Sequence, residues 1–110
     1  MNNLTQKKCE ACSIDTPPMK REAIMENLGK LHKDWSVVDE RQISRDFTFK
    51  NFREAIAFVN QVADLAEEEG HHPDIYVHNF KNVLIDLMTQ KIQGLSLNDF
   101  IMAAKIDELR

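Results

Sequence analysis

The segment "NFREAIAFVNQVADLAEEEG", from Asn51 to Gly70, predicts the main helix of this chain and the centre of its fold. Asn51 followed by Glu54 forms a capping-box-like pair, and Gly70 is placed to end the helix. Apolar residues recur every three or four positions, which is the spacing of one helix face. The stripe predicted to face the core consists of Phe52, Ala55, Val59, Val62, Ala63 and Ala66.

Alternating residues on either side of this helix predict two β-hairpins. Before it, "SVVDE" and "RQISRDFTFK" are typical of two short strands around a polar turn near Asp39 and Glu40. The two-residue period of the second strand places three apolar residues on one face: Ile43, Phe47 and Phe49. After the helix, "DIYVHNF" and "NVLIDLMT" predict two more strands, joined near Lys81 and Asn82.

A further helix is expected near each end of the chain. The first runs from about Pro18 to His32, with Thr16 as its cap and a proline in its first turn. The last lies in "GLSLNDFIMAAKIDELR", where Ser96 and Asp99 form an S-x-x-D cap. The order helix-strand-strand-helix-strand-strand-helix predicts an α+β fold, a four-stranded antiparallel sheet with three helices on one face.

Length and composition indicate one domain and exclude several classes of function. The chain has 110 residues, 43% of them hydrophobic, so we expect a polar, flexible arm over residues 1–15 and a single domain over 16–110. A net charge of -4 gives no general attraction for nucleic acid. The apolar runs are far shorter than the roughly 20 residues of a membrane span, and no signal pattern opens the chain, so a cytoplasmic protein is expected.

The two cysteines, Cys9 and Cys12, lie together in "CEAC". One C-x-x-C supplies half of a four-thiolate zinc site, and a thioredoxin-like motif should follow a strand and open a helix. Neither condition is met here. We expect two reduced thiols without chemistry, with a metal or an intersubunit role as the remaining alternatives.

The stretch "EEEGHHPDIYVHNF" is the candidate site. Three glutamates at the end of the main helix oppose its dipole, so local stability does not explain them. Pro73 disfavours helical geometry at His72, so the chain turns sharply and presents His71 and His72 beside the helix end. Adjacent histidines on a loop are often merely solvated. Combined with nearby carboxylates, however, they are suited to acid-base chemistry near neutral pH.

The same residues could instead form a metal site. His71, His72, His78 and a glutamate could supply ligands. Consecutive residues of an extended stretch point to opposite sides, and His78 lies further along a strand. The pattern therefore favours acid-base chemistry without a metal.

At these residues the sequence resembles the pterin-4a-carbinolamine dehydratase family. Its signature is an acidic or polar residue, three positions, His-His-Pro, an aromatic residue, and then T-H-x-x-x-G-L-(S/T)-x-x-D. The matching positions are Glu67, His71, His72, Pro73, Phe80 and "TQKIQGLSLND" from Thr89 to Asp99. The similarity extends from Trp35 to the end of the chain. One position departs from the pattern, because Gln90 stands where the family usually has a third histidine. An amide can hydrogen-bond a pterin but cannot exchange a proton at neutral pH, which puts full activity in question.

The resemblance implies a hydro-lyase that dehydrates 4a-hydroxytetrahydropterin to quinonoid dihydropterin and so recycles the cofactor of aromatic amino-acid hydroxylases. It implies that His71 and His72 form the acid-base and substrate-contact pair. The sequence does not separate their roles, and we assign the proton transfer at the hydroxyl or N5 to His72 and the holding of the pterin to His71. Glu67 would orient an imidazole. The further substrate-binding candidates are Gln90, Pro73 and Asp99, although the capping position of Asp99 makes a structural role at least as well supported.

The resemblance further implies that no metal or organic cofactor is needed. It also implies a homodimer or homotetramer and a possible association with a hydroxylase. Two other functions stay open at this stage. One is a catalytically weakened family member that acts as an assembly or coactivator module for another protein. The other is a metal-dependent enzyme that uses the same histidines.

Overall fold

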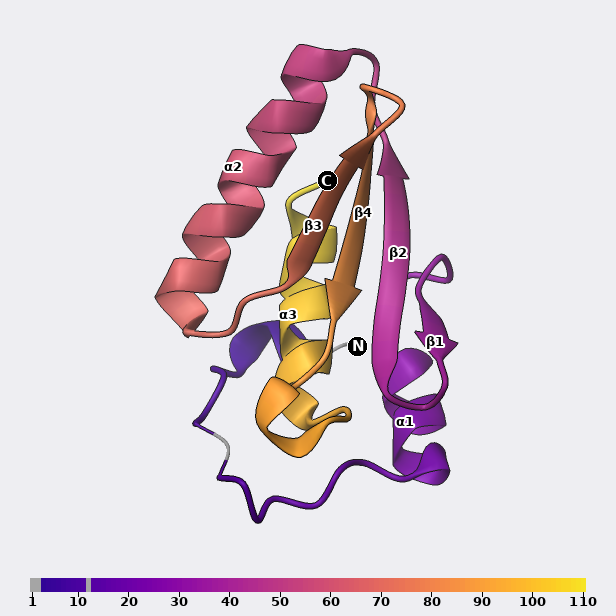
Figure 1. Cartoon of the computed structure of the whole chain (residues 1–110), viewed down its shortest axis with the longest axis vertical. Helices are drawn as coiled ribbons and strands as arrows, with labels where there is room; N and C mark the ends of the chain where they lie inside the picture. The colour runs from indigo at the N-terminus through magenta and orange to yellow at the C-terminus, as the bar shows by residue number, and fades with distance from the viewer. Residues whose placement is uncertain (1–2, 12) are drawn as a thin grey trace.

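The protein is described here by a computed structural model that covers residues 3–11 and 13–110. Figure 1 shows the order of its elements, three α-helices and four strands with two short 3-10 turns. The bounds are η1 (Leu4–Gln6), α1 (Arg21–Leu28), β1 (Ser36–Val38), β2 (Gln42–Thr48), α2 (Phe52–Glu69), β3 (Asp74–His78), β4 (Asn82–Leu87), η2 (Gln90–Ile92) and α3 (Leu97–Glu108). The predicted α+β class and element order are confirmed.

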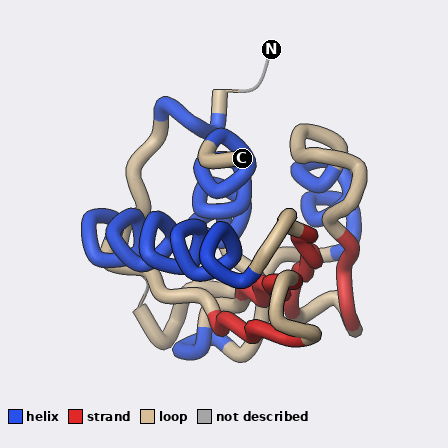
Figure 2. The backbone as a smooth tube through the Cα atoms, turned by 90° about the horizontal axis from the view of Figure 1, so that it is seen from above, coloured by secondary structure: helices blue, strands red, loops and turns tan. Residues whose placement is uncertain are grey.

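The four strands form one antiparallel sheet in the order β1-β2-β4-β3. β2 and β4 pair at the centre, where Phe47 lies opposite Val83 and Ile43 opposite Leu87. These inward residues are almost completely buried. The helices gather over one side of the sheet, as Figure 2 shows, and the core fills the space between the two layers.

Both hairpins turn through two consecutive residues in the left-handed conformation. Asp39 and Glu40 have φ values of 54° and 55°, at the predicted place. The second turn uses Asn79 and Phe80, with φ values of 52° and 53°, and so comes slightly earlier than predicted. Asn82 already pairs with His78 and with Thr48 inside the sheet, which fixes the turn before it. Phe80 consequently points out of the core and is 59% exposed.

Helix α2 begins and ends as predicted, but its buried face is rotated. The Glu54 N–H donates to the Asn51 side chain over 2.9 Å, and Gly70 closes the helix at a φ of 66°. The buried apolar residues are Ala55, Phe58, Val62 and Ala66. Phe52 and Ala63, which were predicted to be core, are exposed. Both residues lie to the side of the buried row formed by Ala55 and Val62, on a part of the helix surface that the sheet does not cover.

Helix α1 is shorter than the predicted Pro18–His32. It starts after Lys20, which gives no side-chain cap, and it ends at Leu28. Thr16 instead sits in a turn and contacts Ser13, so its predicted capping role is wrong. The Met19 N–H donates to the Leu95 carbonyl over 2.8 Å, so the chain just before Lys20 is bonded to the segment that precedes α3, and the helix starts later.

Helix α3 starts at the predicted cap. Ser96 and Asp99 form a capping box, in which the Ser96 N–H donates to Oδ2 of Asp99 over 3.0 Å. The helix is buried over most of its circumference, and it packs between β4 and η1.

The amino-terminal segment packs against the domain. Leu4 is 2% exposed in the core, and the Cys9 and Glu10 backbones bond to Glu69 and Asn98. The expected division of the chain into an arm over residues 1–15 and a domain over 16–110 stays a prediction. Cys12 lies outside the described residues. Within those residues, no helix combines the length and hydrophobicity that crossing a membrane requires.

Candidate active site

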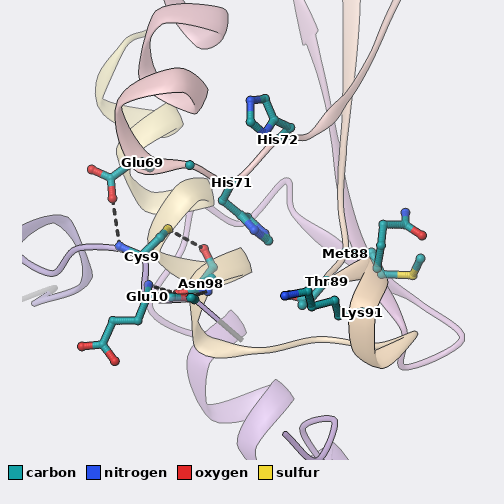
Figure 3. Close-up of a pocket in the computed structure, with 12 residues that line it drawn as sticks. Cys9, Glu10, Glu69, His71, His72, Met88, Thr89, Lys91 and Asn98 are labelled. Atoms are coloured by element: carbon teal, nitrogen blue, oxygen red, sulfur yellow. Dashed lines mark hydrogen bonds between the residues drawn. The ribbon is translucent and has the colours of Figure 1, made fainter. Parts of the chain in front are cut away.

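A cleft of about 550 Å³ lies where the end of α2, the segment after β4 and the amino-terminal segment meet. It is lined by residues 9–11, 69–72 and 88–91, together with Asn98. Figure 3 shows His71 between Cys9 and Asn98 on one side and Met88, Thr89 and Lys91 on the other. The volume falls within the range of small-molecule sites, roughly 300–1,000 Å³.

The turn after α2 places both histidines at this cleft. Gly70 adopts the left-handed conformation, and the Gly70 and His71 N–H groups both donate to the Ala66 carbonyl, at 2.9 and 3.2 Å. Pro73 then directs the chain into β3. The sharp turn predicted from this stretch is confirmed, because the helix ends on two backbone bonds rather than fraying.

The imidazole of His71 is bonded to a buried carboxylate. Its Nε2 lies 2.7 Å from Oδ1 of Asp99, and the two side chains are 13% and 0% exposed. Thr89 Oγ1 and the Ser96 N–H both donate to the other oxygen of Asp99, at 2.8 and 3.0 Å. An ionised carboxylate only accepts hydrogen bonds. An ionised Asp99 would therefore accept the bond from an Nε2–H of His71, which leaves Nδ1 as the ring nitrogen that is not bonded to the carboxylate.

The imidazole of His72 is also bonded to a carboxylate, but both side chains are exposed to solvent. Its Nε2 lies 2.6 Å from Oε2 of Glu67, five residues earlier on the last turns of α2. The side chains of His72 and Glu67 are 61% and 77% exposed. Glu67 is thus in position to orient this ring, although water weakens the pairing.

The remaining predicted site residues are placed differently. Gln90 starts η2 and lines the cleft with an exposed side chain. Pro73 and Asp99 do not line the cleft. Since Asp99 is fully buried, it can act on a substrate only through the cleft residues bonded to it, His71 and Thr89.

His78 is not part of this site. Its Nε2 bonds to Oδ1 of Asp46 at 2.9 Å, a pair that reaches from β3 across β4 to β2. Across residues 3–11 and 13–110, no cluster of three or more histidines, cysteines or acidic residues could hold a metal ion.

Sequence reasoning missed Glu69, the one buried member of the glutamate run. It is 8% exposed, its Oε1 accepts the Cys9 N–H at 2.9 Å, and its Oε2 accepts Lys105 Nζ at 2.7 Å. Burial by itself raises the pKa of Glu69, but the bonds from Cys9 and Lys105 outweigh it and lower the pKa below its usual value. The helical spacing from Val62 and Ala66 could have shown that this glutamate faces inward.

Cys9 and Asn98 are two further residues of the cleft that were not predicted as site residues. The Cys9 sulfur donates to the Asn98 carbonyl at 3.6 Å. Burial, followed by the nearby Glu69 carboxylate, raises the pKa of the Cys9 thiol from 9.0 to about 12. At neutral pH this thiol is protonated, so it is a weak nucleophile.

The chain is similar to known proteins over nearly its whole length. A family model described as pterin 4 alpha carbinolamine dehydratase matches residues 17–109. A protein of Alkaliphilus metalliredigens, provisionally assigned as a pterin-4-alpha-carbinolamine dehydratase, is 46% identical over 108 residues, which cover 98% of this chain and 96% of that protein. A protein of Marinobacter nauticus with the same provisional assignment is 49% identical over 112 residues, 99% of both chains.

Two solved structures share the fold. A transcriptional coactivator/pterin dehydratase from Brucella melitensis superimposes with a TM-score of 0.77 and 32% identity, covering 84% of this chain and 97% of that one. A pterin dehydratase-like protein, identified as a RuBisCO assembly factor in the alpha-carboxysome, gives a TM-score of 0.60 and 28% identity, covering 71% of this chain and 90% of that one. The match of the family model and these whole-length similarities show that the chain belongs to the pterin-4a-carbinolamine dehydratase family.

Proposed function

We propose that this protein dehydrates 4a-hydroxytetrahydropterin to quinonoid dihydropterin by general acid-base catalysis. One observation carries the proposal: two adjacent imidazoles line one cleft, and each has its Nε2 on a carboxylate. The reaction requires two proton transfers on neighbouring atoms of one ring, which suits a pair of imidazoles in this arrangement.

The protons balance without a redox step. A proton is delivered to the 4a-hydroxyl, which leaves as water, and the proton on N5 is removed. A neutral imidazole with its Nε2–H on a carboxylate has a basic Nδ1, and an imidazolium can donate from the same atom. We assign the proton transfer at the 4a-hydroxyl or at N5 to His72 and the holding of the pterin to His71. No metal or organic cofactor enters this scheme.

The carboxylates act through the histidines. Glu67 fixes the His72 ring, and Asp99 fixes the His71 ring in one tautomer with less freedom, because Asp99 is itself held by Thr89 and Ser96. Gln90 is assigned to hydrogen bonding with the polar pyrimidine edge of the pterin. Pro73 supports the site through the backbone at His72 rather than through contact with the substrate.

The test is the dehydration rate of freshly generated 4a-hydroxytetrahydropterin, followed by absorbance. Wild type and the His71→Ala/His72→Ala variant are compared with the spontaneous reaction. Acceleration by wild type that vanishes in the folded double variant supports the proposal. A folded wild-type protein that gives only the spontaneous rate would contradict it.

A second function is favoured by two observations. Gln90 leaves the site with two histidines, and the chain is similar to the pterin dehydratase-like RuBisCO assembly factor. In this alternative the protein is a weakened enzyme kept as a binding or coactivator module for another protein. Binding of a protein partner that survives alanine at both histidines would favour this role.

Three further predictions concern the oligomeric state, a functional partner and the cellular compartment. We propose a homodimer or homotetramer, since the edge strands β1 and β3 leave backbone groups that association can pair. An aromatic amino-acid hydroxylase is proposed as a functional partner, and the cytoplasm as the compartment. Sedimentation analysis of the full chain tests the first of these, with a monomer as the contrary result.

A further inference from the structure

Residues 9–11 form one wall of the cleft, and we call this segment the strap. Its backbone is held by side chains from two helices. Oε1 of Glu69 accepts the Cys9 N–H at 2.9 Å, and Oδ1 of Asn98 accepts the Glu10 N–H at 2.9 Å. Nδ2 of Asn98 also donates to the Glu10 carbonyl at 2.5 Å. Glu69 and Asn98 are each 8% exposed.

Glu69 and Asn98, the two anchors of the strap, are polar side chains held in defined pairings. Asn98 pairs with both backbone groups of Glu10, as a neighbouring β-strand would. Glu69 keeps a buried charge beside Lys105, although a carboxylate at the end of a helix opposes the dipole. Two buried polar side chains thus fix two of the three strap residues, Cys9 and Glu10.

The strap is thin, and it separates two cavities. On its far side lies a second cavity of about 540 Å³, whose lining includes Lys7, Lys8 and Leu97. The two cavities share Glu10, Ala11 and Asn98. Because Glu10 and Ala11 line both cavities, the position of the strap sets the width of the cleft on this side.

The direction in which a pterin would lie follows from the proposed function. In Figure 3 the strap lies on one side of His71, and Met88, Thr89 and Lys91 lie on the other. The proposed function places the polar pyrimidine edge at Gln90, within that opposite segment. C6 of the pterin is bonded to the reacting N5 and lies on the edge away from the pyrimidine ring. The substituent at C6 would then be directed toward the strap.

We propose that the strap is the specificity-determining wall for the C6 substituent of the pterin, and that Glu69 and Asn98 are positioning residues that hold it. This inference rests on the proposed function. Cys9 and Ala11 present small side chains there, so the wall leaves room for a substituent longer than methyl.

The first test measures whether the anchors hold the strap. In a full-length Cys12→Ser background, the labelling rate of Cys9 by a neutral disulfide reagent is compared among variants. Glu69→Ala and Asn98→Ala should label about tenfold faster or more, because a released Cys9 gains water and a lower pKa. Glu69→Gln keeps an acceptor for the Cys9 N–H and should remain closer to wild type. Glu68→Gln, on the exposed side of α2, is the control.

The second test measures specificity, with 4a-hydroxytetrahydropterins that carry a methyl or a 1,2-dihydroxypropyl group at C6. Ala11→Leu narrows the cleft at an exposed strap residue, so the fold does not depend on this side chain. The ratio of kcat/KM for the longer substrate over the shorter should fall about tenfold. Ala63→Leu, at an exposed alanine of α2 outside the cleft, should leave the ratio unchanged.

The outcomes separate this inference from the proposed function. If wild type turns over neither pterin, the proposed function fails and the inference fails with it. If both pterins are turned over and Ala11→Leu leaves the ratio unchanged, only the strap inference is overturned. Labelling of Glu69→Ala and Asn98→Ala at the wild-type rate would overturn the positioning roles.

Discussion

Nε2 of His71 lies 2.7 Å from Oδ1 of Asp99, a residue 28 positions later in the chain. This contact connects the turn after α2 to the capping box of α3. One carboxylate therefore starts a helix and fixes a cleft-lining imidazole. Because Asp99 is 0% exposed, both tasks depend on the same buried charge.

Asp99→Asn should lower turnover about ten- to hundredfold. It should also lower the free energy of unfolding by about 1–3 kcal/mol. The amide has one acceptor oxygen for the three donors that now converge on Asp99, so at least one loses its partner. Turnover and urea unfolding measure the two effects, with Asp64→Asn at an exposed position of α2 as the control. Lower stability with full turnover in the folded enzyme would show that Asp99 serves the fold alone.

His72→Ala should lower turnover by about 10²- to 10⁴-fold, because it removes a proton-transfer group. The free energy of unfolding should change by less than about 0.5 kcal/mol, since the His72 side chain is 61% exposed. His78→Ala is the matched control, as it removes an exposed imidazole that is also paired with a carboxylate but lies outside the cleft. Full activity of the His72 variant would remove this residue from the mechanism.

Gln90→His should raise turnover by about tenfold or more, because it restores an ionisable group at the position where the family usually has a third histidine. Gln90 is exposed at the cleft, so the new ring has space. Gln61→His, on the exposed side of α2, controls for a general effect of an added histidine. An unchanged or lower rate would mean that the amide at position 90 is fully suited to this site.

Glu69 should make stability depend on pH in acid. The pKa of Glu69 is lower in the folded protein than its ordinary value of 4.5. The unfolded chain therefore takes up this proton first as the pH falls. Ionised Glu69 stabilises the fold above pH 4.5, and the contribution is lost as the pH falls through the lowered pKa.

The measurement is urea unfolding of wild type and Glu69→Gln over a series of pH values. The difference in unfolding free energy should be largest near neutral pH and should shrink below pH 4.5. Other carboxylates titrate in both proteins and cancel in the difference. Glu68→Gln provides the comparison with an exposed neighbour. A difference that stays constant with pH would mean that Glu69 contributes no ionised-state stabilisation.

Local sequence was sufficient for much of the scaffold. The cap at Asn51, the left-handed Gly70 and the Ser96–Asp99 box act within a few residues, so their patterns predicted both ends of α2 and the start of α3. The start of α1 was not decided locally, because the Met19 N–H donates to the carbonyl of the distant Leu95. The buried face of α2 was not predicted in full. Phe52 and Ala63 are apolar, but the extent of the sheet decides which helix residues are covered.

The sequence by itself determined the α+β order and the turn that carries the two histidines, because caps, turn residues and periodicity act along the chain. Only the tertiary structure decided which groups meet at the cleft. Asp99 reaches His71 across 28 positions, and Glu69 reaches Cys9 across 60. A buried charge is stable only when its partners arrive from other elements, and no local pattern records which elements those are.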